Sequence, residues 1–306
     1  MLEIIFLGTG GSVPTTEKNT AAVMVRYDGR KILFDCGEGT QKQMMIAKTG
    51  VNRGLNQIFI SHFHADHFIG LPGLFQTMNF NGREEDLFVY GPKHTKKFLA
   101  VVKNMGYCRF NFNIIYQELM DGDCIEGDGY SITAFDTDHN VPSLGYIFQE
   151  EDRPGRFNTD AAISLGLKPG PLYSKLVSGE AIEVDGRIIL PTMVIGPPRR
   201  GIKIVYSGDT RPCEKLFNAV KNADVAILDG TFDGSLKDWA DQTRHSTIKE
   251  SIELGLKAGV KKIVLTHTSP RYSANKEPLY SDIRGLNNVV IAEDFLRLDV
   301  PYRDSF

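Results

Sequence analysis

Short hydrophobic runs in which apolar and polar residues alternate mark the beginning of the chain as β-rich. LEIIFLG at 2–8 has the length of one strand, and AAVMVRYDGRKILFDCG at 21–37 has the length of two. In the second run, Tyr27-Asp28-Gly29-Arg30 separates two apolar stretches, and an Asp-Gly pair there predicts a β-hairpin. The next segment, TQKQMMIAKTG at 40–50, predicts a helix that ends at Gly50.

Strand-like and helix-like segments alternate along the rest of the chain. The strand-like NQIFI leads directly into a histidine-rich stretch, and Thr247-x-x-Glu250 fits a capping box that opens a helix. Strands precede helices twice over, an order that predicts an α/β layered sandwich of sheets flanked by helices. Further strands are expected at 86–91, 113–119, 130–136, 144–149, 202–209, 224–230 and 261–267, and further helices at 71–80, 94–106, 214–222 and 246–257.

The composition of the chain changes between about residues 150 and 201. RPGRFN, LKPGPLY and GPPRRG are rich in Pro, Gly and Arg, and the segments between them have weak periodicity. This change predicts that 1–306 forms a single domain with an inserted flexible arm at about 150–201 that is not part of the core. Its basic residues are offset by acidic ones, so the arm is not strongly basic; the acidic residues are Glu150, Glu151, Asp152, Asp160, Glu180, Glu183 and Asp185.

Composition excludes few classes of function. The chain has 306 residues, 42% hydrophobic content and a net charge of −3, so global charge does not indicate a nucleic-acid binder. Any polyanion would have to be held by a local patch or by metal. The opening run is expected to be a strand and not a signal peptide, and no stretch approaches the ~20 apolar residues of a membrane span. The four cysteines form no CxxC pair, which predicts a cytoplasmic protein with reduced thiols.

The stretch SHFHADH contains the densest group of metal-binding residues in the chain. His62, His64, Asp66 and His67 follow an apolar strand, and strand ends that feed loops are where ligands meet on a rigid scaffold. Imidazole and carboxylate together suit zinc, manganese or iron. A chance surface cluster is the alternative, but the chain has only seven histidines. A metal site is therefore the stronger interpretation.

Four adjacent candidates do not converge easily on one tetrahedral ion, because neighbouring side chains point in different directions. The stretch is better interpreted as two half-sites that need ligands from elsewhere. His139, Asp209 and His267 each follow an apolar strand, as His62 does. Each of the three taken singly is more often an ordinary hydrogen-bonding residue, but together they repeat one geometry.

These residues resemble the HxHxDH pattern and later ligands of the metallo-β-lactamase fold. The finer motifs resemble ribonuclease Z, the tRNA 3′-processing endonuclease, in its short form. They extend in order through nearly the whole chain: FLGTGGSVPT, FDCGEGTQ, SHFHADHFIGLPGL, DHNVPSLGY, GPLYSKL, GPPRRG, YSGDT, RHST and HTSPRY.

The resemblance implies a four-layer αββα sandwich that holds two Zn²⁺ per subunit, with Mn²⁺ or another divalent ion as a substitute. One zinc is implied on His62, His64 and His139, and a second on Asp66, His67 and His267, with Asp209 bridging. Asp66 would position and deprotonate the attacking water, and His245 would protonate the leaving 3′ oxygen; a capping or surface histidine is the alternative for His245. Two ions ~3.5–4 Å apart can share a hydroxide for attack at phosphorus.

The substrate implied by the resemblance is a tRNA precursor, cut 3′ of the discriminator base to leave a tRNA 3′-hydroxyl and a trailer 5′-phosphate. The resemblance also implies a homodimer in which one subunit's arm grips the tRNA bound to its partner; neither DNA nor a membrane is expected as a partner. Another hydrolase of the same fold, acting on small phosphodiesters or aryl sulfates, is an alternative, as is a silent RNA-binding relative.

Weaker candidates for substrate contact lie outside the cluster. Arg271 could hold a phosphate or form a structural ion pair, and Arg199 and Arg200 are the clearest basic patch of the arm. His94 is expected on the surface at the start of a helix. GTGGS at 8–12 lacks the lysine and helix of a P-loop, so it is expected to be a tight turn or a wall of the metal pocket.

Overall fold

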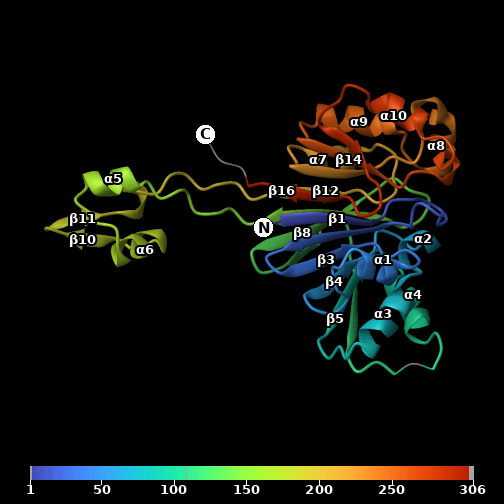
Figure 1. Ribbon diagram of the computed structural model, residues 1–306, viewed down its shortest axis with the longest axis horizontal. Coiled ribbons are helices and arrows are strands. Elements are labelled where there is room, and N and C mark those ends of the chain that lie inside the picture. Colours follow the sequence, from blue (N-terminus) through green and yellow to red (C-terminus); the bar gives the residue numbers. More distant parts are fainter. Residues whose placement is uncertain (1, 108, 303–306) are drawn as a thin grey trace. The chain divides into compact units, whose positions relative to one another are not determined.

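The computed structural model describes residues 2–107 and 109–302 (Figure 1). The chain divides into two compact units. The first consists of the chain up to Gln149 together with Lys203–Pro301, and the second consists of Glu150–Ile202 with Tyr302.

Two seven-stranded sheets form the centre of the first unit. The first sheet has the order β16 (Arg297–Val300), β1 (Leu2–Gly8), β2 (Ala22–Tyr27), β3 (Arg30–Phe34), β4 (Leu55–Phe59), β5 (Leu87–Gly91) and β6 (Ile114–Glu118). The second has the order β15 (Val289–Ile291), β14 (Lys262–Thr266), β13 (Val225–Asp229), β12 (Lys203–Tyr206), β9 (Leu144–Glu150), β8 (Tyr130–Asp136) and β7 (Cys124–Glu126). In each sheet several neighbouring strands are parallel, including β3, β4 and β5 in the first and β12, β13 and β14 in the second. Their carboxyl ends therefore meet along one edge.

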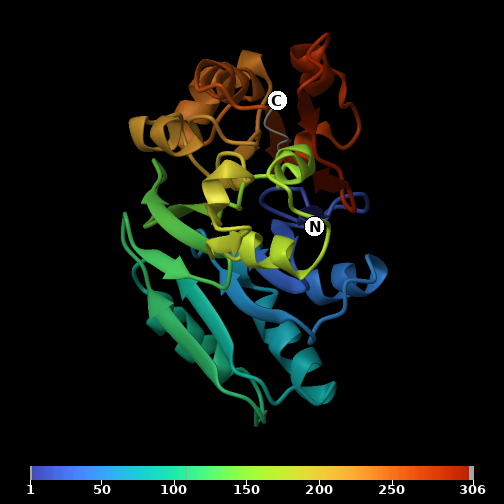
Figure 2. The ribbon, with the colours of Figure 1, turned by 90° about the vertical axis from the view of Figure 1, so that its left-hand side faces the viewer.

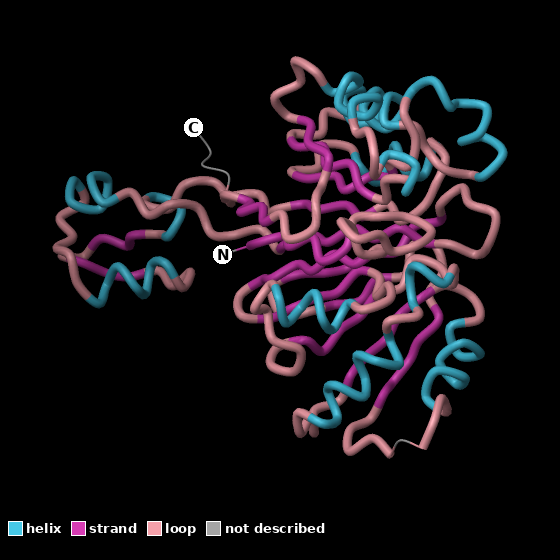
Figure 3. The backbone as a smooth tube through the Cα atoms, turned by 45° about the vertical axis from the view of Figure 1, so that its right-hand side comes forward, coloured by secondary structure: helices cyan, strands magenta, loops and turns pink. Residues whose placement is uncertain are grey.

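Helices cover the outer faces of the two sheets, which gives the four-layer αββα sandwich that the sequence predicted (Figures 2 and 3). In Figure 2 the cyan helices of the first half and the orange helices of the second half lie on opposite sides of the strands. The helices of the first half are α1 (Thr40–Ile46), α2 (Ala65–Phe68), α3 (Leu71–Phe80) and α4 (Thr95–Lys103). Those of the second half are α7 (Glu214–Val220), α8 (Lys237–Thr243), α9 (Ile248–Lys257) and α10 (Glu277–Ile283), with short 3₁₀ turns at Gly234–Leu236 and Pro270–Tyr272.

An aromatic layer joins the two sheets. Phe34 on β3 stacks on Tyr206 of β12 at 5.5 Å between ring centroids, and Phe59 on β4 meets Tyr146 of β9 edge-on at 5.2 Å. The hydroxyl of Tyr146 also donates a hydrogen bond of 2.6 Å to the carbonyl of Ile60. These rings are almost fully buried, so the two sheets hold a fixed spacing beneath the strand ends.

Local signals in the sequence were correct in kind and wrong at some boundaries. The hairpin between β2 and β3 and the capping box Thr247–Glu250 are confirmed. Helix α1 was predicted to end at Gly50, but it ends at Ile46, because Lys48 takes the left-handed conformation at φ 54° and its amide caps the carbonyl of Met45. The predicted helix 246–257 begins at Ile248, since Thr247 is its N-cap.

The second unit has a small core of its own, which weak periodicity concealed in the sequence. Its elements are α5 (Thr159–Ser164), α6 (Pro171–Val177), the hairpin β10 (Ile182–Val184) and β11 (Arg187–Ile189), and a 3₁₀ turn at Pro191–Met193. Six buried apolar residues pack together there: Ala162, Leu167, Leu176, Ile182, Ile189 and Val194. The predicted arm is thus a folded element, and the two chain segments at its base pair between Arg153 and Arg199.

Cys36, Cys124 and Cys213 are free, and Cys108 lies outside the described residues. Among the helices that the structure describes, none combines the length and the apolar composition needed to cross a membrane.

Candidate metal centre

The turn that joins β4 to helix α2 explains how His62, Asp66 and His67, which are close in the chain, can belong to two separate groups of metal donors. His62 lies in the turn after the strand, whereas Asp66 and His67 lie on the single turn of helix α2. The helical turn swings these side chains away from the direction set by the strand, because helical and extended residues have different side-chain periods. His62 and His67 are fully buried.

The first group of donors consists of His62, His64 and His139. The Nε2 atom of His62 lies 3.0 Å from Nδ1 of His64, and Nε2 of His139 lies 3.2 Å from the same Nδ1 atom. His139 arrives from the loop between β8 and β9, as the strand-end pattern predicted. Three ring nitrogens thus converge on one point.

The second group consists of Asp66, His67 and His267. Nε2 of His267 lies 3.2 Å from both Nε2 of His67 and Oδ2 of Asp66. His267 follows β14 and has a φ of 62°, in the left-handed region that non-glycine residues rarely adopt. This backbone conformation turns the imidazole toward the group from the end of the strand.

Asp209 lies between the two groups. Its Oδ2 atom is 3.6 Å from Nε2 of His62, 3.2 Å from Nε2 of His67 and 3.3 Å from Nε2 of His267. Its Oδ1 atom is buried and has no hydrogen-bond partner among the described residues. A buried carboxylate oxygen without a partner is costly unless a cation satisfies it, so the site fits divalent metal ions. The donors gather as His62, His64, His139 and Asp209, and as Asp66, His67 and His267, with every donor atom of a group within 4.8 Å of the others.

The ring nitrogens that point away from the centre are held by the protein. Nδ1 of His139 lies 2.9 Å from the carbonyl of Arg244, and Nδ1 of His267 lies 3.0 Å from Oγ1 of Thr231. Nδ1 of His67 lies 2.7 Å from Oδ2 of Asp35. Outer hydrogen bonds of this kind fix the ring orientation and leave the inner nitrogen free to bind metal.

The carboxylate of Asp35 is a functional group that the sequence prediction missed. It accepts hydrogen bonds from the amide and hydroxyl of Ser61, at 2.7 and 2.8 Å, and from the hydroxyl of Tyr206 at 2.6 Å. Asp229 plays a similar part beside His245 and was also missed. Both residues stand at the end of apolar strands, so the same strand-end signal that indicated Asp209 would have indicated them.

Burial and neighbouring charges shift the pKa values of the centre in opposite directions. Burial lowers the pKa of the His62 imidazole well below its usual value. Burial also disfavours charge on His67, but the carboxylates of Asp209 and Asp35 outweigh this and raise its pKa well above the usual value. The histidines around Asp209, led by His267 and His67, outweigh burial and hold the pKa of that carboxyl well below its usual range. The carboxylate is therefore ionised at neutral pH, as a metal ligand requires.

His245 lies at the edge of the same centre. Its ring stacks on that of His267 at 5.2 Å between centroids, and its Nδ1 atom is 3.0 Å from Oδ2 of Asp229 and 3.8 Å from Oδ2 of Asp209. Burial opposes protonation, but Asp229 and Asp209 outweigh it and raise the pKa of His245 to about 9. The alternative reading of a capping residue is wrong, because Thr247 caps α9.

The turn GTGGS forms a wall of the centre. The amide of Ser12 donates a hydrogen bond of 2.6 Å to Oδ2 of Asp66, and a Cβ atom on Gly11 would lie 2.4 Å from the ring of His267. Gly11 therefore leaves room for the imidazole. Of the two alternatives for this turn, the structure supports the wall of the pocket.

The weaker candidates lie farther from the donors. Arg271 is exposed, its guanidinium lies 5.1 Å from the ring centre of Phe232, and it has no ion pair among the described residues. The structural ion pair that was the alternative role of Arg271 is therefore absent among the described residues. Arg199 and Arg200 belong to the second unit, and Arg199 donates a hydrogen bond to the carbonyl of Pro154. His94 is exposed and precedes α4, as predicted.

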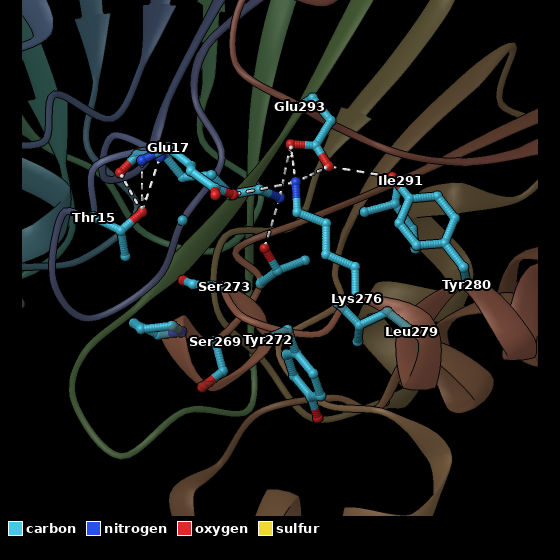
Figure 4. Close-up of a pocket in the computed structure, with 14 residues that line it drawn as sticks. Thr15, Glu17, Ser269, Tyr272, Ser273, Lys276, Leu279, Tyr280, Ile291 and Glu293 are labelled. Atoms are coloured by element: carbon cyan, nitrogen blue, oxygen red, sulfur yellow. Dashed lines mark hydrogen bonds and ion pairs between the residues drawn. The ribbon is translucent and has the colours of Figure 1, made fainter.

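A pocket next to His267 contains two lysines whose charges are balanced (Figure 4). The ammonium of Lys18 donates a hydrogen bond of 2.9 Å to Oγ1 of Thr268 and lies 3.5 Å from Glu293. Lys276 pairs with both Glu293 and Glu17, at 3.3 and 3.5 Å. This network anchors the residue after His267 to the loop between β1 and β2.

Comparisons with solved structures define the class of protein. The chain has the fold of the crystal structure of the metallo-β-lactamase fold protein YhfI from Bacillus subtilis, with a TM-score of 0.69 and 16% identity over 98% of this chain and 100% of that chain. It is also similar to the crystal structure of human tRNase Z, short form, with a TM-score of 0.71 and 25% identity over 98% of this chain and 99% of that chain. The protein is a metallo-β-lactamase-fold protein whose strand ends carry donors suited to divalent metal ions.

Comparisons with curated proteins define the family. The chain is 51% identical over 304 residues to ribonuclease Z of Methanosarcina acetivorans, covering 99% of each protein. It is 48% identical over 307 residues to ribonuclease Z of Archaeoglobus fulgidus, covering all of each protein. The chain belongs to the ribonuclease Z family, as its motifs indicated. Residues 2–164 also match the family described as Anti-Pycsar protein Apyc1, whereas the ribonuclease Z matches continue through the second sheet.

We expect Asp35→Asn to weaken zinc binding roughly 10- to 100-fold, since an amide is a poorer acceptor for the ring of His67. Zinc affinity of the folded protein, measured by competition with a chelator, tests this. Asp299→Asn, on the exposed strand β16, is the matched control and should bind zinc like the unaltered protein. Equal zinc affinity of both variants would show that Asp35 does not support the metal ligand.

Proposed function

We propose that the protein removes 3′ trailers from tRNA precursors, cutting 3′ of the discriminator base to leave a tRNA 3′-hydroxyl and a trailer 5′-phosphate. As a member of the ribonuclease Z family, the chain is an endoribonuclease. The observation that carries the proposal is the convergence of two donor groups on Oδ2 of Asp209, with His245 beside them. The choice of tRNA is supported by the likeness to human tRNase Z.

The cofactor in this proposal is two Zn²⁺ per subunit, which Mn²⁺ or another divalent ion could replace. His62, His64 and His139 would hold one ion, and Asp66, His67 and His267 the other, with Asp209 between them. Bound divalent ions would lower the pKa of a water molecule and neutralise charge on the phosphate. The short distances from Oδ2 of Asp209 to Nε2 of His62, His67 and His267 support this assignment, because this one oxygen faces both groups.

Two side chains have catalytic roles in this proposal. Asp66 would orient the attacking water and accept its proton, and the hydrogen bond from the amide of Ser12 keeps the carboxylate in place. His245 would donate a proton to the leaving 3′ oxygen. Its hydrogen bond to Asp229 supports this role, because a carboxylate on Nδ1 favours the protonated imidazole and orients Nε2.

The second unit would act as an exosite for tRNA. Its charges are mixed, and the proposed contacts are Arg199, Arg200 and the backbone amides of its glycine-rich segments. Arg271 would contribute a further phosphate contact near the centre. Exposed main-chain donors and arginines recognise a phosphate backbone without reading its bases, which suits a substrate class defined by shape.

The assembly and the compartment are also part of the proposal. We infer a homodimer from the resemblance to the family, and the exposed side chains of Met45 and Ile46 at the end of α1 offer apolar surface for a second copy. Precursor tRNA as substrate supports a cytoplasmic location. The mass of the protein in solution measures the oligomeric state directly.

The decisive experiment is to incubate the protein with a 3′-extended tRNA and map the cut to the nucleotide. We expect one cut after the discriminator base, about two zinc ions per chain, and no cleavage by Asp66→Ala, because this change removes a metal donor and the partner of the water. Binding of the precursor by Asp66→Ala should survive. Cleavage of an aryl phosphodiester without cleavage of the precursor would favour another hydrolase of this fold, and an inactive wild-type protein that still binds the precursor would favour a silent RNA-binding protein.

For His245→Ala we expect cleavage of the precursor to slow by roughly 10²- to 10⁴-fold, the usual contribution of a general acid. Both zinc ions should remain bound. His245 forms a third donor group with Asp209 and His267, but both of these residues also belong to a donor group that does not include His245. Single-turnover rates and the zinc content of the same sample test the two statements together. Loss of a zinc ion on this substitution would assign His245 to the metal ligands instead.

Deletion of residues 153–200 tests the exosite, because it removes the arm together with Arg199 and Arg200. The amide of Gly201 donates a hydrogen bond of 2.9 Å to Oδ1 of Asp152, so a short Gly-Ser link can close the gap between these two residues. We expect precursor tRNA to bind at least roughly tenfold more weakly, because the contacts of the arm contribute to affinity, while hydrolysis of bis(p-nitrophenyl) phosphate stays unchanged. Full-rate cleavage of the precursor at low substrate concentration would exclude the arm from recognition.

A further inference from the structure

Arg211 is a buried charged residue whose position in the chain links it to the metal centre. It follows Asp209 by two residues, and only 7% of its surface is exposed. The acidic partners Glu250 and Asp241 outweigh the effect of burial and raise the pKa of its guanidinium. A buried arginine is costly unless its donors are satisfied, so its contacts show which groups it holds together.

The guanidinium of Arg211 holds the loop that carries His245. One nitrogen, Nη1, donates hydrogen bonds of 2.7 Å to the carbonyl of His245 and 2.8 Å to Oε2 of Glu250. The other, Nη2, lies 2.6 Å from Oε1 of Glu250 and 2.6 Å from Oδ1 of Asp241. The bidentate pair with Glu250 fixes the plane of the fork, and the fork then fixes the carbonyl of His245.

The backbone of Arg211 is hydrogen-bonded to the segment that carries His139. Its amide donates a hydrogen bond of 2.9 Å to the carbonyl of Asp138, the residue before His139. Arg244, the residue before His245, forms an ion pair of 3.2 Å with Asp138, and its carbonyl lies 2.9 Å from Nδ1 of His139. One residue therefore connects the segments that carry Asp209, His139 and His245.

The loop between α8 and α9 needs this connection. Arg244 has a φ of 59°, in the left-handed region, and the main-chain amide of His245 is bonded to the carbonyl of Ala240 in α8. Without the guanidinium, the carbonyl of His245 would lose its charged donor and Glu250 would be left without the bidentate partner. The loop would then be free to move the imidazole relative to Asp209.

We propose that Arg211 is a positioning residue, which holds His245 in the geometry needed to donate a proton to the leaving oxygen. The inference rests on the proposed function and adds a residue to it. Arg211 touches neither substrate nor metal in this account, so its loss should slow proton donation and leave metal binding intact. A misplacement of ~1 Å in such a group can cost ~10²-fold in rate.

The test compares two substrates whose leaving groups differ in whether they need a proton donor. The 3′ oxygen of the precursor is a poor leaving group, whereas p-nitrophenolate leaves bis(p-nitrophenyl) phosphate without a proton. For Arg211→Gln we expect kcat on the precursor to fall ~100-fold, with KM, zinc content and aryl ester hydrolysis close to those of the wild type. Arg211→Lys should recover only part of the rate, because an ammonium group cannot form the fork.

A double variant separates positioning through His245 from other effects. If both residues act in one step, Arg211→Gln combined with His245→Ala should be no slower than His245→Ala alone. The matched control is Arg284→Gln, since Arg284 forms an exposed ion pair with Glu277 and should leave every rate unchanged. If Arg211→Gln fails to fold, Glu250→Gln keeps the helix cap, weakens the fork and should slow the precursor reaction in the same selective way.

The outcomes that overturn the proposal are distinct. Three results would each show that Arg211 does not position His245. The first is an equal loss of rate on both substrates for Arg211→Gln, and the second is a loss of zinc from this variant. The third is a double variant whose loss of rate is the product of the losses caused by Arg211→Gln and His245→Ala. A wild-type protein that hydrolyses the aryl ester but not the precursor would overturn the proposed function and this inference with it. Wild-type cleavage of both substrates with equal losses for Arg211→Gln would overturn only the inference.

Discussion

The structure of the centre depends on one buried carboxylate, that of Asp35. It stands just after β3 of the first sheet and accepts a hydrogen bond from Tyr206 on β12 of the second. It also accepts hydrogen bonds from Ser61 and lies against Nδ1 of His67. A buried charge requires several donors, and here the donors come from both sheets and from the metal-binding turn. The same contacts therefore join the two halves of the sandwich and orient the ring of His67, a candidate metal ligand.

A centre of this kind is stable only on a rigid support. It brings seven donor residues together, and its own interactions leave Oδ1 of Asp209 without a hydrogen-bond partner in the described part of the chain. Metal binding to such a cluster would stabilise the fold, because the donors are brought together only in the folded state. The aromatic layer of Phe34, Tyr146 and Tyr206 lies directly beneath the strand ends and supplies dense apolar packing. The site is thus supported by the core below it, and a bound divalent ion would satisfy the donors within it.

The proposed proton donor, His245, and the support of the candidate metal ligand His139 lie in one segment of the chain. The carbonyl of Arg244 supports His139, while the next residue, His245, faces Asp229. Arg211 adds a third connection, from the segment of Asp209 to the carbonyl of His245. Because these bonds run through main-chain atoms as well as side chains, the relative positions of the groups are set by backbone geometry, which side-chain motion changes little.

The sequence by itself determined the strands, the capping box at Thr247 and the chemical type of the site. These signals are local: an Asp-Gly hairpin, a T-x-x-E box and histidines after an apolar strand each depend on a few adjacent residues. The same signal would have indicated Asp35 and Asp229, but their role depends on partners from distant strands. The resemblance implied that His62 and His67 belong to different groups with Asp209 between them, but only the tertiary structure brought the donor atoms together and gave the weakly periodic segment 150–202 a core of its own. The physical reason is that these properties arise from contacts between residues far apart in the chain, and local spacing does not encode such contacts.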